Sequence, residues 1–216
     1  IEEEQCVFTL SHAGYIKRVP AATYRAQRRG GRGVTGMTTR EEDFVESVFS
    51  ASTHDYLLFF TNRGRVHRRK GYQIPEAGRT AKGTNIVNIL PLEAGERVTA
   101  GITVHDFDED YLMLVTKNAT VKRLELSALY TARKAGIRAL TIAEDDELIA
   151  VLKTSGENNI ILATAGGMAI CFCETDVRVM GRDAAGVRGM ALGAGDYVVG
   201  AGIAEPGKEL LTVTQN

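Results

Sequence analysis

The chain has no tryptophan, few other aromatic residues and only three cysteines. With 6% aromatic residues, it offers few of the exposed anchors that dominate protein–protein interfaces. The cysteines, Cys6, Cys171 and Cys173, form neither a CxxC motif nor an even-numbered disulfide framework, which favours a reducing cytoplasm. No apolar run approaches the roughly 20 residues of a membrane span, and the start, Ile1–Glu4, is unlike a signal peptide. We therefore expect a cytoplasmic protein that does not bind a membrane.

Chemical signatures of an enzyme are also missing. The four histidines, His12, His54, His67 and His105, lie far apart and show no metal-ligand spacing. No Gly-x-x-x-x-Gly-Lys-Ser/Thr loop is present, and no nucleophile and base are brought together by a motif. The sequence predicts no catalytic residue, metal or cofactor in this chain.

The net charge of −1 hides an uneven distribution. Residues 47–95 carry seven Lys or Arg against three Asp or Glu, a balance of +4. The local cluster of positive charge, rather than the net charge of the chain, determines the electrostatic field near a polyanion. A nucleic-acid partner is therefore compatible with the composition.

The chain repeats one plan of an apolar strand, a tight turn and a second, usually basic strand. The turn residues are Gly14, Gly64, Ala119 and Gly167, at intervals of 50, 55 and 48 residues. A second landmark has intervals of 50, 53 and 50 residues and consists of Gly33, Gly83, Gly136 and Gly186. Two landmarks with one spacing predict a solenoid, a propeller or an array.

The repeats predict an all-β, propeller-like fold. Short runs such as Leu57–Phe60 are apolar throughout, as in strands covered on both faces, whereas Arg65–Arg68 alternates, as in strands with one wet face. Only 41–47 and 126–135 offer room for a helical turn. Four strands per repeat give blades that shield one another's edges. The expected repeats form one domain, 1–216, with approximate boundaries 1–46, 47–95, 96–146, 147–196 and a partial 197–216.

The most distinctive stretch is Gln27–Gly33. It holds three guanidinium groups, one amide and three glycines without an acid. Arginine forks match phosphate oxygens in pairs, and glycine lets the backbone approach another surface closely. This composition indicates a loop suited to a polyanionic strand.

Cations also recur at one register, three and four residues after the turn. The pairs are Lys17-Arg18, His67-Arg68 and Lys122-Arg123, whereas the fourth copy has Ile170-Cys171. A recurring register beside an arginine-rich loop favours phosphate contacts over simple blunting of strand edges. The stripe is expected to become weaker at the fourth copy.

With these features the sequence resembles the C-terminal DNA-wrapping domain of bacterial DNA gyrase A, which is part of a type II topoisomerase. Gln27–Gly33 matches the seven-residue box of that family, with arginine at position 32 where lysine is usual, and Gly14–Pro20 and the repeats agree along the chain. The resemblance implies a β-pinwheel, normally of six blades, whose neighbouring blades exchange strands. The fifth copy stops at its turn, Thr214–Asn216, so we expect an incomplete disc of four full blades and part of a fifth.

The resemblance further implies that the basic rim binds and wraps double-stranded DNA with a positive crossover. The holoenzyme of two gyrase A and two gyrase B chains would then introduce negative supercoils with ATP and Mg²⁺ used in its other parts. The chain alone is expected to have no catalytic residue and to act on the bacterial chromosome in the cytoplasm. Two alternatives remain, the related C-terminal domain of topoisomerase IV, in which the box is degenerate or missing, and a propeller used for protein interaction.

The expected DNA-binding residues comprise the box, the repeated register and further cations near the second and third copies. They are Gln27, Arg28, Arg29, Gly30, Gly31, Arg32, Gly33, Lys17, Arg18, Arg63, Arg65, His67, Arg68, Arg69, Lys70, Arg79, Lys82, Lys122, Arg123, Lys134 and Arg138.

Overall fold

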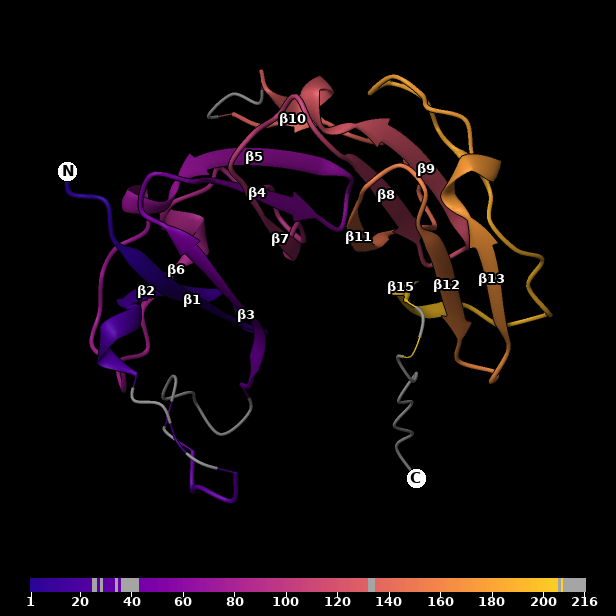
Figure 1. Cartoon of the computed structure of the whole chain (residues 1–216). Coiled ribbons are helices and arrows are strands. Elements are labelled where there is room, and N and C mark those ends of the chain that lie inside the picture. Colours follow the sequence, from indigo (N-terminus) through magenta and orange to yellow (C-terminus); the bar gives the residue numbers. More distant parts are fainter. Residues whose placement is uncertain are drawn as a thin grey trace. The chain divides into compact units, whose positions relative to one another are not determined.

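A computed structural model describes residues 1–24, 27, 29–33, 35, 43–131, 135–205 and 207. Within that part the regular elements are β-strands and short 3-10 turns, and the strands form four antiparallel sheets. The sheets can be followed along the colour gradient of Figure 1, from β1 to β15. The expected all-β fold of repeated, blade-like sheets is confirmed.

The chain divides into two compact units. The first contains Ile1–Phe107 and Leu129–Ala139, and the second contains Asp108–Ala128 and Leu140–Asn216. The segment 129–139 therefore belongs to the first unit although the chain on both sides of it belongs to the second.

The first unit holds two four-stranded sheets. Sheet 1 has the order β3 (Val45–Ser52), β1 (Gln5–Ser11), β2 (Tyr15–Pro20) and β6 (Thr84–Asn85). Sheet 2 has the order β10 (Ile137–Arg138), β5 (Arg65–Lys70), β4 (Tyr56–Thr61) and β7 (Val98–Val104). The accompanying 3-10 turns are η1 (Ala21–Thr23), η2 (Gly71–Gln73) and η3 (Ile86–Asn88).

The second unit holds the other two sheets. Sheet 3 has the order β11 (Leu148–Thr154), β8 (Tyr111–Thr116), β9 (Thr120–Glu125) and β14 (Val187–Arg188). Sheet 4 has the order β13 (Ala169–Cys173), β12 (Asn159–Thr164) and β15 (Val198–Ala204). The 3-10 turn η5 covers Glu174–Asp176, and η4 covers Leu126–Leu129 at the border of the units.

Each sheet combines a local hairpin with strands from further along the chain. The hairpins β1–β2, β4–β5, β8–β9 and β12–β13 close on the predicted turns, where Gly14 has φ +90° and Ala119 has φ +67°. In sheet 1 the hairpin pairs on one side with β3 and on the other with the two-residue strand β6. Sheets 2 and 3 repeat this plan, so three of the sheets receive two strands each from later sequence.

Apolar side chains of these strands build a separate core in each unit. In the first unit Phe8, Leu57 and Phe59 are fully buried, and Phe8 stacks on Phe49 with 5.3 Å between ring centroids. The core of the second unit includes Met113 and Leu162. All four residues of Leu57–Phe60 are 0% exposed, which confirms the expectation from their unbroken apolar run.

The two segments with room for a helical turn differ in the structure. Strand β3 already includes residues 45–47, so the helical turn allowed over 41–47 is wrong for these positions, which pair with β1. A 3-10 turn at Leu126–Leu129 occupies the start of the second allowed helical segment. The end of the fifth copy, Thr214–Asn216, lies outside the described residues. No helix in the described part is long and apolar enough to cross a membrane.

Candidate nucleic-acid interface

The repeated cation register exists in the structure, but most of its members are buried. Lys17, His67 and Lys122, three positions after the turn, are each 0% exposed. Arg69 and Arg123 are 7% and 8% exposed. The expectation that these five side chains contact phosphate directly is therefore corrected, because in this structure almost none of their surface is accessible.

The two buried lysines bind backbone carbonyls of a loop that arrives from later sequence. Lys17 Nζ donates hydrogen bonds to the carbonyl oxygens of Gly78, Arg79 and Ala81 at 2.9, 2.6 and 2.8 Å. Lys122 Nζ donates to those of Arg182 and Ala184 at 2.6 and 3.0 Å. Burial lowers the pKa of Lys17 and lowers that of Lys122 to about 8.

The lowered pKa of Lys122 predicts a pH-dependent stability. The folded protein releases this proton near pH 8, whereas the unfolded chain retains it until about pH 10.5. Between these values the unfolded state binds more protons, so the contribution of Lys122 to the free energy of unfolding rises with pH. We expect the melting temperature of the wild type to rise relative to that of Lys122→Met over this range, measured by circular dichroism. Parallel pH profiles of the two proteins would contradict this assignment.

His67 occupies the same register in sheet 2 and is packed against a glycine. A Cβ atom built on Gly136 would lie 2.6 Å from His67 Cε1, so only glycine fits against the ring without a shift. Gly136 also has φ +81°, which favours glycine independently. The landmark glycine thus marks where later sequence packs over the hairpin.

The next residue of the register, an arginine in three copies, also makes contacts within the protein. Arg18 Nε donates to the Ile74 carbonyl at 2.7 Å, and its guanidinium lies 3.4 Å from the Glu76 carboxylate. Arg123 Nε lies 3.1 Å from Glu174 Oε1, whose side chain is 0% exposed. These arginines join a hairpin to the chain that follows it, and Arg18 keeps 15% of its side chain exposed.

Arg68 fills the same position in sheet 2 with aromatic partners. Its guanidinium carbon lies 5.0 Å from the Tyr56 ring centroid and 5.3 Å from that of Tyr130, within cation–π range. Lys70 Nζ lies 3.7 Å from the Tyr56 ring. Both cations remain partly exposed, so they can add to the field of the surface.

Other cations that face solvent lie in turns, in loops and at strand ends, outside the buried register. Arg63, Arg79 and Arg138 are exposed, and Arg65 and Lys82 are partly exposed. Residues Arg65 and Arg138 are paired in the β5–β10 ladder, which brings two of the cations together at one end of sheet 2. This group supplies positive charge accessible to a polyanion.

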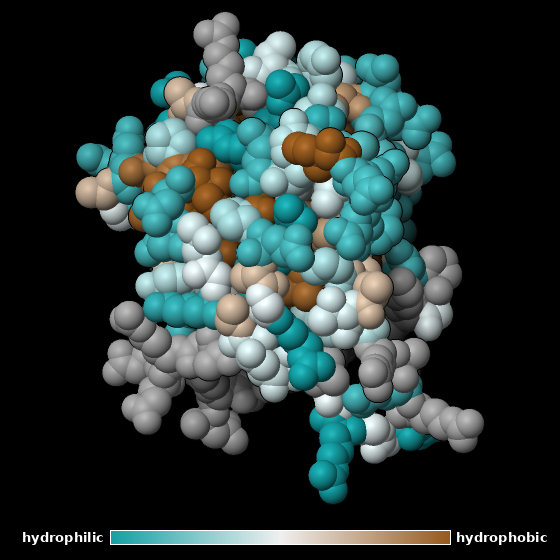
Figure 2. All heavy atoms as spheres, turned by 90° about the vertical axis from the view of Figure 1, so that its left-hand side faces the viewer, coloured by the Kyte–Doolittle hydropathy of each residue, from teal (hydrophilic) through white to brown (hydrophobic). Residues whose placement is uncertain are grey.

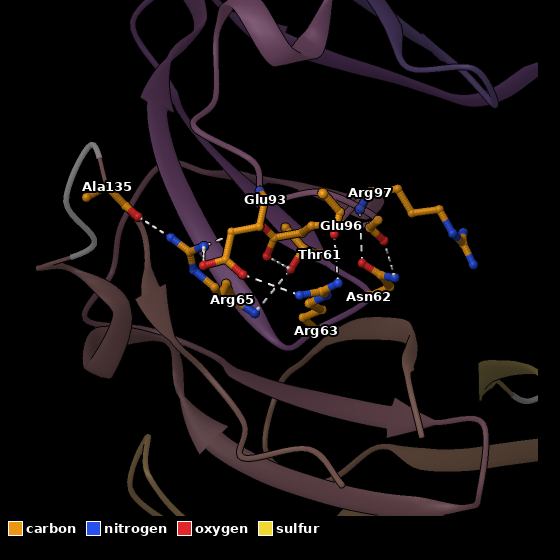
Figure 3. Close-up of polar contacts among 10 residues, drawn as sticks. Thr61, Asn62, Arg63, Arg65, Glu93, Glu96, Arg97 and Ala135 are labelled. Carbon is orange, nitrogen blue, oxygen red and sulfur yellow. Dashed lines mark hydrogen bonds and ion pairs between the residues drawn. The ribbon is translucent and has the colours of Figure 1, made fainter. Parts of the chain in front are cut away.

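Figure 3 shows how the turn of sheet 2 orders part of this group. Arg65 lies 3.3 Å from Glu96 Oε1 and also donates to the Ala135 carbonyl, while Arg63 lies 3.3 Å from Glu93 Oε2. The Glu96 side chain is 0% exposed, whereas that of Glu93 is 65% exposed. The inner carboxylate therefore fixes Arg65, and the outer pair with Arg63 is solvated and weak.

One exposed cation of this turn, Arg97, is not among the residues expected from the sequence. Arg97 precedes β7, and its backbone exchanges hydrogen bonds with Asn62, from Arg97 N to Asn62 Oδ1 at 2.9 Å and from Asn62 N to Arg97 O at 3.0 Å. Figure 3 shows its side chain extending away from Glu93 and Glu96. Arg97 lies near Arg63 because β7 pairs with β4. Positions counted from the hairpin turn do not report this pairing, because β7 lies outside the hairpin.

The arginine-rich box is closed by its own glutamine. Gly33 N donates to Gln27 Oε1 at 2.8 Å, and Gln27 Nε2 donates to the Gly33 carbonyl at 3.4 Å, so one amide joins the two ends of the box. Gly30 has φ +88°, a value that glycine adopts without strain. Arg29, Gly31 and Arg32 are exposed between these ends. Arg28, and Lys134 elsewhere, lie outside the described residues.

The second unit presents fewer cations in the corresponding places. Ile170 and Cys171 stand at the register positions of sheet 4, and both are exposed. Arg178 and Arg188 are exposed as well, but residues 147–216 carry five Lys or Arg against eight Asp or Glu. Among the described side chains, no group of three or more His, Cys, Asp or Glu could hold a metal ion.

Comparison with known proteins adds to this geometry. A sequence profile described as "DNA gyrase C-terminal domain, beta-propeller" matches residues 7–52, 55–105, 110–155 and 158–205, most of the chain. The DNA gyrase A protein of Clostridium acetobutylicum is 51% identical over 190 residues, covering 88% of this chain and 23% of that protein. The gyrase A protein of Staphylococcus epidermidis is 50% identical over 220 residues, covering 100% of this chain and 25% of that protein. The chain thus spans about a quarter of the length of these relatives.

Two solved structures have the same fold. The C-terminal domain of DNA topoisomerase IV superposes with a TM-score of 0.79 at 30% identity, covering 95% of this chain and 62% of that chain. The DNA gyrase A C-terminal domain superposes with a TM-score of 0.72 at 27% identity, covering 92% and 64%.

Proposed function

Because this chain belongs to the DNA gyrase C-terminal domain family, we propose that it binds double-stranded DNA and wraps it with a positive crossover for a type II topoisomerase. The observation that carries the proposal is the set of outward-facing arginines. Arg29 and Arg32 lie in the box, and Arg63, Arg79 and Arg138 lie on the loops and strand ends of the first unit.

These cations suit binding that follows the phosphate backbone. Bending 20–30 base pairs of duplex by 40–90° costs about 1–6 kcal/mol, so contacts must recur along the path. Lys and Arg side chains supply them by releasing counterions without reading bases. Repetition of one blade plan offers such contacts at intervals along the DNA.

In the cell we propose that the domain acts within a complex of gyrase A with gyrase B on the bacterial chromosome. That complex would convert the wrap into negative supercoils with ATP and Mg²⁺ held in its other parts. On this proposal the chain alone is no enzyme and holds no cofactor. Its partners are double-stranded DNA, the rest of gyrase A, and gyrase B.

A related domain of topoisomerase IV is the main alternative, and its solved structure superposes well. The intact box, closed by the hydrogen bonds between Gln27 and Gly33, favours gyrase, because the box is degenerate or missing in the topoisomerase IV domain. A protein-interaction platform has less support. The chain has no tryptophan and few other aromatic residues, and the face shown in Figure 2 is mainly hydrophilic, with apolar residues on a smaller part of it.

The test of the proposal is a topology measurement. The domain is bound to nicked circular DNA, the nick is ligated, the protein is removed, and the linking number is compared with a protein-free control. We expect a positive shift that grows with protein concentration. Binding without a shift would support the topoisomerase IV alternative, and no binding in a gel-shift assay would leave the interaction platform.

The uneven charge predicts an unequal contribution of the two units. Replacing Arg79, Lys82 and Arg138 by alanine is expected to weaken duplex binding about tenfold or more, because three phosphate contacts are lost from a cationic surface. The matched triple replacement of Arg178, Arg182 and Arg188 removes the same charge from the acidic segment, and we expect a loss of less than about threefold. Fluorescence anisotropy with a labelled duplex measures both. Equal losses would show that the second unit contributes as much as the first.

A further inference from the structure

We infer that Lys17 is a positioning residue, which holds the loop Gly78–Lys82 in the conformation that presents Arg79 and Lys82 to DNA while itself remaining buried. The inference rests on the proposed function, because the loop is taken to contact DNA. It replaces the expected phosphate contact of Lys17 by an indirect role.

The ammonium group of Lys17 is used entirely by this loop. It has three N–H donors, and they match the three carbonyl oxygens of Gly78, Arg79 and Ala81 at 2.9, 2.6 and 2.8 Å. The residue is 0% exposed, so no donor remains for a ligand. Three of the five loop residues are thus bound to one side chain from a strand more than 60 positions earlier.

The loop has few other internal restraints of comparable strength. Ala77 N donates to the Arg18 carbonyl at 3.1 Å, and Ala81 N donates to the Gly78 carbonyl at 3.0 Å. Gly83 ends the loop with φ +90°, and a Cβ there would lie 2.5 Å from the Ile16 carbonyl oxygen. The loop is therefore attached to β2 at its two ends and, through Lys17, in its middle, whereas the Ala81–Gly78 bond lies within the loop itself.

The same loop carries two cations at the surface. Arg79 is exposed, and Lys82 Nζ lies 3.6 Å from the ring centroid of Tyr15, which neighbours Lys17 on β2. One short strand segment therefore orients both the backbone of the loop and the side chain of Lys82. A shift of this backbone would displace both charges together.

Lys122 repeats the arrangement in the second unit and provides a matched control. Its Nζ binds the carbonyls of Arg182 and Ala184, again about 60 positions later. The loop that it holds differs in charge, since Asp183 follows Arg182 where Thr80 follows Arg79. Removing Lys122 thus perturbs an equivalent buried lysine whose loop carries no excess positive charge.

The experiment compares Lys17→Met, Lys122→Met, the double variant Arg79→Ala/Lys82→Ala and the triple combination of that double variant with Lys17→Met. Affinity for a labelled duplex and its salt slope are measured in the whole chain well below the melting temperature. We expect Lys17→Met to weaken binding about tenfold and to reduce the log–log salt slope by roughly 2, as does the double variant. The triple variant should be no weaker than the double variant, because both changes remove the same contacts.

Lys122→Met should lower the melting temperature while changing affinity by less than about twofold. The inference is overturned if Lys17→Met lowers only the melting temperature, or if its effect on affinity adds in full to that of the double variant. If Lys17→Met does not fold, Lys17→Gln keeps two donors. It should then bind more weakly than the wild type with a reduced salt slope, and unchanged binding would overturn the inference. A wild type that binds no duplex would instead refute the proposed function.

Discussion

Replacing Arg28, Arg29 and Arg32 together by alanine is expected to abolish DNA wrapping while leaving most of the binding and the fold intact. Arg29 and Arg32 are exposed in a loop that Gln27 closes onto Gly33, so their removal withdraws charge without disturbing either core. On the proposed function the other exposed cations would still bind phosphate, but the DNA would lose the loop that holds the wrap in place. We expect the linking-number shift to fall to the protein-free value and affinity to fall by less than about tenfold.

The control for this variant is Arg178, Arg182 and Arg188 replaced by alanine, which removes the same number of positive charges elsewhere. It should keep most of the linking-number shift. Circular dichroism and thermal denaturation verify that both variants fold as the wild type does. Normal wrapping by the box variant would show that the box has no central role in the proposed function.

Affinity for duplex DNA is expected to fall by about 10³-fold or more between 50 and 200 mM salt, which is the loss typical of six or more phosphate contacts. Arginine and lysine on loops displace counterions from DNA, and this gain vanishes as bulk salt rises. The measurement is a log–log plot of the binding constant against salt concentration. Two unrelated duplex sequences should give the same slope within about one unit, since the contacts do not read bases. A flat plot would exclude phosphate-dominated binding.

The repeat plan and the strands were predictable because they rest on local chemistry. Leu57–Phe60 is apolar throughout and becomes a strand with both faces covered, and Gly14 and Gly64 supply the positive φ that tight turns need. The box was recognisable for a similar reason, since its arginines, glycines and Gln27 lie within seven consecutive residues.

The orientation of the basic strands was not predictable in the same way. The polar side chains of Lys17 in β2 and His67 in β5 favour a solvent-exposed position, but both are buried under residues of the next repeat. The cover of Lys17 lies 61 to 64 residues further on, and the cover of His67 centres on Gly136. No local periodicity reports such a contact, and a buried lysine becomes acceptable only once its carbonyl partners are known.

Sheets 1 to 3 each contain strands from the following repeat, and this limits how such a chain can gain or lose a repeat. Sheet 1 extends from Gln5 to Asn85 and sheet 2 from Tyr56 to Arg138, so the stretch that one sheet needs overlaps the stretch that its successor needs. One sequence repeat therefore does not contain all the strands of one sheet, because each sheet takes strands from two successive repeats. An added or deleted repeat alters two sheets at once. It is tolerated only if its landmark glycine is followed by a short strand that pairs with the hairpin of the preceding repeat. Selection on these joints would keep the glycine spacing regular while the loops between them diverge in charge, which is the combination of constancy and variation that the four copies display.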